Sequence, residues 1–79
     1  MTCRDTPIGI VRDHADELNR IDSHHATELR LVADHMQRHG LSDDAQAAAN
    51  LIKRRMHPEW LDGAVRECVE RLIRTLRAY

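Results

Sequence analysis

Histidine is the residue whose chemistry stands out, with six in 79 residues, five of them in the first half of the sequence. On a helix, residues four apart share a face, so His35 and His39 could reach one metal ion, and His24 and Glu28 have the same spacing. Imidazole and carboxylate are ordinary ligands for Zn, Ni or Fe. However, a histidine-rich helix contains such spacings by chance. We therefore expect no metal or other cofactor, and these four residues are ligand candidates only under an alternative interpretation. A pH-sensitive interface is also left open, because imidazole titrates near neutrality.

A basic cluster with a nearby tryptophan is the second chemical feature. Arginine binds carboxylate and phosphate in bidentate fashion, and tryptophan is enriched at the energetic centres of interfaces. Alternatively, the cations complement the dipole at a helix end, and the tryptophan covers the core. We predict that the cluster binds a partner, with a protein as that partner. Its residues are Lys53, Arg54, Arg55, Trp60, Arg66 and Arg74.

Catalytic motifs are absent from the sequence. No Ser or Cys stands at motif spacing from a His and an acid, and there is no Gly-rich phosphate loop. Cys3 and Cys68 lie far apart and are expected to be free thiols in a reducing compartment. We therefore predict a cytoplasmic protein that is not an enzyme.

The charge balance is close to neutral, with a formal net charge of −1 at pH 7. Residues 1–40 carry five Arg and seven acidic residues, for −2, and residues 41–79 carry seven basic and six acidic residues, for +1. Neither half is typical of a general nucleic-acid binder, although nucleic acid stays an alternative partner. No apolar run is long enough for a signal peptide or a membrane span, so we expect no membrane partner.

The elements that must position these residues are helical. Apolar side chains recur in steps of three and four, which predicts an amphipathic helix over about 6–39. The predicted stripe along one side of this helix consists of Ile8, Val11, Ala15, Leu18, Asp22, His25, Leu29, Val32, Met36 and His39. We predict one continuous helix, because no Gly or Pro lies between Val11 and His39. The alternative is a break near Asp22, with Asp22 or Ser23 capping a second helix.

Two shorter helices are predicted to follow, at about 43–56 and 58–78. Gly40 should end the first helix, Ser42 should cap the second, and Pro58 should end the second and begin the third. The predicted fold class is thus an all-α, small helical bundle with one long N-terminal helix packed against two shorter ones. We expect residues 1–79 to form one domain with a flexible tail at 1–4. A broken first helix would instead give a compact bundle of three or four short helices. A core this small also makes a homodimer plausible.

Residues 13–20, Asp-His-Ala-Asp-Glu-Leu-Asn-Arg, resemble a segment of the second helix of the Rop family of plasmid copy-number proteins. Members of that family are RNA-binding helical hairpins that dimerise into four-helix bundles. The resemblance covers eight of 79 residues and includes none that the family uses for RNA. It implies an amphipathic helix, and no RNA-binding residue is carried over.

No motif identifies a function, so the prediction rests on size and class. A short all-α chain without catalytic motifs is typical of a small protein-binding regulator or inhibitor. The Arg-, Ala- and Asp-rich composition fits a high-GC bacterium or its phage. A phage-encoded inhibitor of a host or defence complex is therefore the most specific form of the prediction. The alternatives are a histidine-rich metal-binding helical bundle and a dimeric RNA- or DNA-binding regulator.

Overall fold

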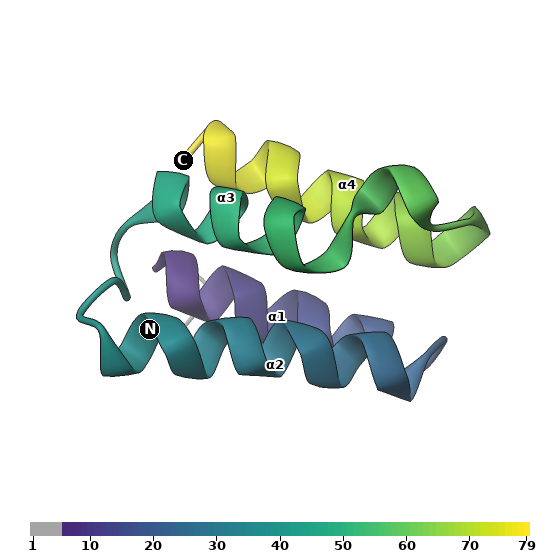
Figure 1. The fold of residues 1–79 in the computed structure, drawn as a ribbon, viewed down its shortest axis with the longest axis horizontal. Helices are drawn as coiled ribbons and strands as arrows, with labels where there is room; N and C mark the ends of the chain where they lie inside the picture. The colour runs from purple at the N-terminus through teal and green to yellow at the C-terminus, as the bar shows by residue number, and fades with distance from the viewer. Residues whose placement is uncertain (1–5) are drawn as a thin grey trace.

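The computed structural model describes residues 6–79, and its regular elements are all helices (Figure 1). The α-helices are α1 (Pro7–Leu18), α2 (Ser23–Arg38), α3 (Ala45–Met56) and α4 (Gly63–Arg77), with the short 3-10 helix η2 (Pro58–Trp60) before α4. The prediction of an all-α bundle is confirmed, and 78% of the described residues are helical. The predicted number of helices is wrong, because four α-helices replace the expected three. The predicted tail at 1–4 lies outside the described residues.

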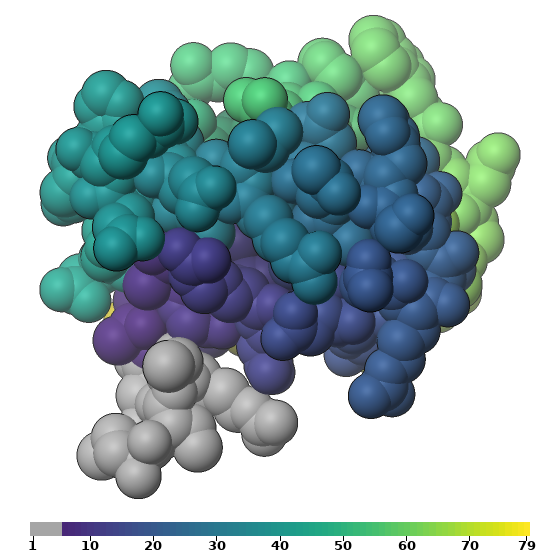
Figure 2. All heavy atoms as spheres, turned by 90° about the horizontal axis from the view of Figure 1, so that it is seen from below, coloured from purple at the N-terminus to yellow at the C-terminus, as the bar shows by residue number. Residues whose placement is uncertain are grey.

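Successive helices run in opposite directions, so the chain passes up and down the bundle twice (Figure 1). α1 and α2 lie side by side on one side of the molecule, as Figure 2 shows from below, and α3 and α4 lie on the other. α4 also packs against α1, which closes the bundle. Short connections favour this arrangement of antiparallel neighbours. The molecule measures 30 × 24 × 22 Å.

The continuous helix predicted over 6–39 is wrong, and the alternative break at Asp22 is the one observed. Asp22 has an extended backbone (φ −153°, ψ 101°), and its carboxylate accepts a hydrogen bond of 3.1 Å from the backbone N–H of His25. This N-cap satisfies an amide that would otherwise lack a partner at the start of α2. The His25 ring Nδ1 lies 2.9 Å from Asp22 Oδ2, although these two atoms are not aligned for a hydrogen bond. The chain therefore folds into a helical hairpin.

The end of α2 follows the prediction. His39 is the C-cap, and Gly40 adopts the left-handed conformation with φ +68°. The N–H of Leu41 then donates to the carbonyl of Met36 at 2.7 Å. This is the hydrogen-bond pattern of a glycine-capped helix end, and it turns the chain toward α3.

The starts of the last two α-helices differ from the prediction. Asp44, rather than Ser42, caps α3 by accepting a hydrogen bond from the Ala47 N–H at 2.9 Å, so α3 begins at Ala45 and not at 43. Pro58 does end α3, with His57 left-handed at φ 48°, but it begins only η2. The helix expected over 58–78 begins at Gly63, whose φ of +55° cannot continue a right-handed helix from the preceding turn.

The core is aliphatic and lies between the four helices. Its largest fully buried side chains are Leu18, Leu29, Met36, Ile52, Leu72 and Leu76. Six apolar positions of the predicted stripe are buried, on both sides of the break, whereas His39, predicted on the same stripe, is exposed. The six are Val11, Ala15, Leu18, Leu29, Val32 and Met36. Among residues 6–79, no helix is long and apolar enough to cross a membrane.

Candidate functional site

Ion pairs link the helices across three of the four seams, a seam being the line along which two neighbouring helices meet. Such exposed pairs each contribute only about 0–1 kcal/mol, but they show that opposite charges face each other there. The pairs are Arg30–Asp16 at 3.1 Å and Arg12–Asp34 at 3.6 Å for α1–α2, Arg55–Glu28 at 2.9 Å for α2–α3, and Arg71–Glu17 for α1–α4.

The fourth seam, between α3 and α4, contains an open groove of about 340 Å³, and no ion pair joins these two helices among residues 6–79. We call it the basic groove. Lys53 lines it from α3, and Arg74 and Arg77 line it from α4. Its apolar lining is Pro58 and Ile73. The remaining lining residues are Glu59, Arg66 and Glu70.

The two carboxylates in the basic groove already have partners. Arg66 Nε lies 3.3 Å from Glu70 Oε2 on the same helix, and Glu59 Oε2 lies 3.7 Å from the ring Nδ1 of His57. Lys53, Arg74 and Arg77 have no ion-pair partner within residues 6–79. Like charges that share a groove repel one another, so an added anion would be attracted to this site.

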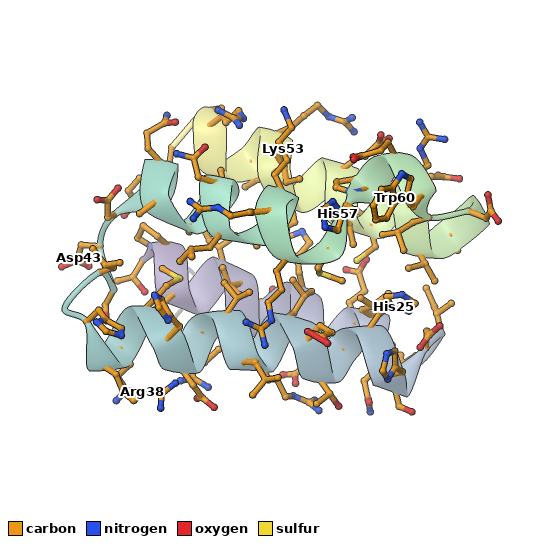
Figure 3. All side chains as sticks on the ribbon, in the orientation of Figure 1. His25, Arg38, Asp43, Lys53, His57 and Trp60 are labelled. Carbon is orange, nitrogen blue, oxygen red and sulfur yellow. The ribbon has the colours of Figure 1, made fainter. Side chains whose placement is uncertain are left out.

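Trp60 does not line this groove but follows Pro58 and Glu59, which do, and it is 74% exposed (Figure 3). Its ring stacks on His57, with centroids 4.3 Å apart and planes 23° apart. The stack fixes the indole against the turn and leaves most of it in solvent. A cover for the core, the alternative explanation of this tryptophan, is therefore wrong.

The basic residues predicted as one cluster are divided between two sides of α3. Lys53, Arg66 and Arg74 line the basic groove, whereas Arg54 and Arg55 line a second groove of about 220 Å³ between α2 and α3. The sequence prediction missed Ile73 and Arg77. Their spacing from Arg66 and Arg74 could have revealed them, because positions 66, 70, 73, 74 and 77 share one helix face.

The histidine candidates do not come together with further ligands. The rings of His35 and His39 lie 4.3 Å apart, but His24 contacts the His25 ring at 5.4 Å, and Glu28 is paired with Arg55. Over residues 6–79, no group of three or more His, Cys, Asp and Glu side chains is placed to hold a metal ion.

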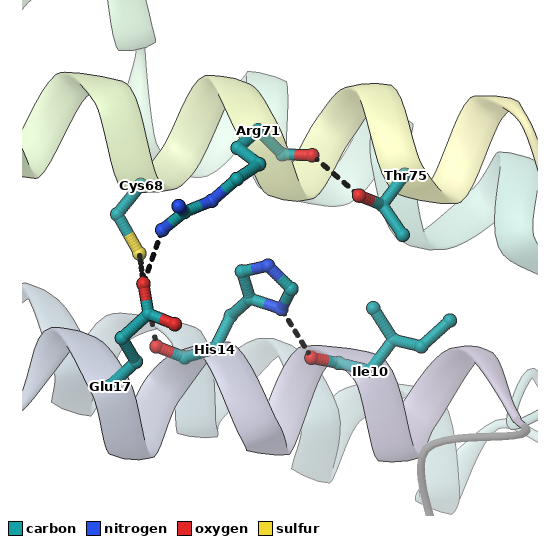
Figure 4. Close-up of polar contacts among 6 residues, drawn as sticks. All are labelled: Ile10, His14, Glu17, Cys68, Arg71 and Thr75. Atoms are coloured by element: carbon teal, nitrogen blue, oxygen red, sulfur yellow. Dashed lines mark hydrogen bonds and ion pairs between the residues drawn. The ribbon is translucent and has the colours of Figure 1, made fainter.

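The contact between α1 and α4 holds the one described cysteine in an unreactive form (Figure 4). Cys68 Sγ is buried, 4.0 Å from both the His14 carbonyl oxygen and Glu17 Oε1. Burial, together with the charge of Glu17, raises the pKa of the Cys68 thiol, although Arg71 acts in the opposite direction. The protonated thiol is neither a good nucleophile nor a metal ligand. Cys3 lies outside the described residues.

No protein-family model, curated protein or solved structure matches this chain. The geometry of its own side chains is therefore the basis on which a function can be proposed.

Proposed function

We propose that the protein is a small, non-enzymatic binding protein that holds an acidic segment of a protein partner in the basic groove. One observation carries the proposal: across the α3–α4 seam, Lys53 faces Arg74 and Arg77 with no acidic residue linking the two helices. The other three seams carry opposite charges. Carboxylates of a partner would supply the missing negative charge, and arginine suits them because it can bind them in bidentate fashion.

A polypeptide suits this groove better than a nucleic acid does. Pro58 and Ile73 offer an apolar surface between the cations, which a peptide with apolar and acidic side chains could cover. A continuous phosphate backbone would place negative charge beside Glu59 and Glu70 as well as beside the cations, whereas a peptide can place its carboxylates beside the cations alone. Exposed Trp60 adds an anchor of the kind that dominates protein–protein binding energy. Binding of this kind would make the protein a regulator or inhibitor, with a phage-encoded inhibitor as one form of it.

Titration of the labelled protein by NMR tests the proposal directly. The probes are a short end-blocked peptide of glutamate and leucine, and an oligothymidylate of the same net charge. We expect the peptide to shift the backbone signals of Lys53, Ile73 and Arg74. Lys53→Glu combined with Arg74→Glu should weaken binding at least tenfold, because each removed charge-assisted hydrogen bond is worth about 1.5–3 kcal/mol.

Arg20→Glu is the matched control. It makes the same charge change as Lys53→Glu or Arg74→Glu alone, each of which is measured beside it, on an exposed residue of the α1–α2 connection that lines neither groove. If the control lost as much affinity for the peptide as the groove variants, the loss would be a general charge effect, and the proposal would be refuted. Tighter binding of the oligothymidylate than of the peptide would favour the nucleic-acid alternative. Native mass spectrometry of the free protein shows whether a homodimer competes for the same surface.

A further inference from the structure

The second groove, between α2 and α3, has a different chemistry from the basic groove. We call it the α2–α3 groove. Leu51 supplies its accessible apolar surface and Val32, only 1% exposed, lies at its floor, and each ionisable residue that lines it, namely His35, Arg54 and Arg55, is basic. The basic groove, in contrast, includes two glutamates. The α2–α3 groove therefore combines an aliphatic wall with a cationic rim.

The two arginines of this groove are in different situations. Arg55 Nε is held by Glu28 Oε2 at 2.9 Å, which fixes that side chain to α2. Arg54 has no ion-pair partner among the described residues, so its guanidinium has donors available for a ligand. One carboxylate beside Arg54 would give it the charge partner that Arg55 already has.

The surroundings of His35 show that the groove is electropositive. Desolvation lowers the pKa of His35 below its ordinary value of 6.5, and His39 and Arg38 on α2 and Arg55 on α3 lower it further. Groups that resist a proton on His35 resist a metal cation as well. The same groups attract an anion.

We propose that the α2–α3 groove binds the C-terminal residue of another polypeptide, with a branched apolar side chain against Leu51, above the buried Val32, and the terminal carboxylate on Arg54. Its volume of about 220 Å³ is below the roughly 300–1,000 Å³ of typical small-molecule pockets, so one side chain and its carboxylate fill it. The groove is open, so a free acid of that size would stay largely hydrated, whereas a chain end brings further surface with it. The site lies across α3 from the basic groove and does not depend on the function proposed for that groove.

Three probes separate the sources of binding. They are acetyl-alanyl-leucine with a free carboxylate, the same dipeptide as its amide, and 4-methylpentanoate, which has the side chain and carboxylate but no peptide group. The readout is NMR of the Val32 and Leu51 methyl groups and of the Arg54 Nε–H. We expect the peptide acid to bind with a millimolar dissociation constant and to shift these three residues, and we expect the other two probes to bind at least tenfold more weakly.

Two variants locate the contacts. Arg54→Gln should weaken the peptide acid about tenfold and leave the amide unchanged, whereas Arg20→Gln, outside the groove, should change neither. Leu51→Ala should weaken the acid and the amide alike. Because protonation of His35 adds a positive charge to the groove and the pKa of His35 is below 6.5, the peptide acid should also bind more tightly at pH 5 than at pH 8, and His35→Gln should reduce that difference.

Three results would overturn the proposal. Equal binding of the acid and the amide would show that the carboxylate is not recognised. Equal binding of 4-methylpentanoate and the peptide acid would assign the groove to a free acid. Shifts that fall outside Val32, Leu51 and Arg54 would place the binding elsewhere on the molecule.

Discussion

Two leucines on the same helix, Leu29 and Leu31, allow a direct test of the bundle. Leu29 is 0% exposed and belongs to the core, whereas Leu31 is 40% exposed. Leu29→Ala should strongly destabilise the fold, and Leu31→Ala, the same chemical change two residues further on, should not. The comparison separates core packing from helix propensity, because both residues lie inside α2.

The size of the effect follows from the burial of Leu29. Loss of three carbon groups at about 0.8 kcal/mol each removes about 2.4 kcal/mol of transfer free energy. The cavity that remains raises the usual cost of a buried Leu→Ala substitution to about 2.7–5.0 kcal/mol. In a domain of this size, 3 kcal/mol corresponds to a fall in Tm of about 12–24 °C. Leu31→Ala should cost less than about 1 kcal/mol, since Leu31 lies outside the core and 40% of its surface is already in water.

Thermal and urea unfolding followed by circular dichroism would measure both variants against the parent protein. The helical signal at low temperature must be retained, so that the comparison concerns stability and not misfolding. If Leu29→Ala and Leu31→Ala shifted the midpoint equally, α2 would not be oriented as described. A continuous helix with a different partner would then have to be considered again.

Three further predictions concern the caps and the thiol. The backbone N–H of His25 holds the pKa of the Asp22 carboxyl below its ordinary value of 3.8, so the stability that its charged form contributes is present above about pH 4 and is lost as the pH falls through the lowered pKa. In Tm measurements over this range, Asp22→Asn should therefore show a weaker acid dependence than the parent. Gly40→Ala should cost about 1–2 kcal/mol in urea unfolding, because φ is +68° there while space for a methyl group is free. In a Cys3→Ser background, Cys68 should react with a thiol reagent only as fast as the protein unfolds, and rapid native-state labelling would contradict its burial.

The faces of the helices could be predicted from the sequence, but the first chain reversal could not. Steps of three and four placed Leu18 and Leu29 in the core correctly, because α1 and α2 face the same core. A pattern of this kind shows which side of a helix is buried. It does not reveal a turn after which the second helix still presents its apolar side to the same core. The reversal depends on the local cap at Asp22, and no Gly or Pro marks it.

The exposure of the candidate residues was predicted more successfully than their grouping in space. Basic residues and Trp60 were expected on an exposed surface, and they are exposed. Neighbours in sequence were assumed to be neighbours in space, which fails on a helix, where each residue turns by about 100°. Lys53 and Arg54 therefore face different grooves. The second groove could be predicted only from the position of α2, which depends on the chain reversal at Asp22 that the sequence offered as the alternative.

The order of the helices has a consequence for the speed and order of folding. Three of the four seams join helices that are consecutive in the chain, and helical proteins with such local contacts fold in about microseconds to milliseconds. Only the α1–α4 seam, where Cys68 is buried, joins helices that are far apart in the sequence, so we expect it to form after the other three. In stopped-flow measurements we expect Cys68→Ala to accelerate unfolding more than it slows folding, whereas Leu29→Ala should slow folding as well. The bundle would then begin to open along the line where its first and last helices meet.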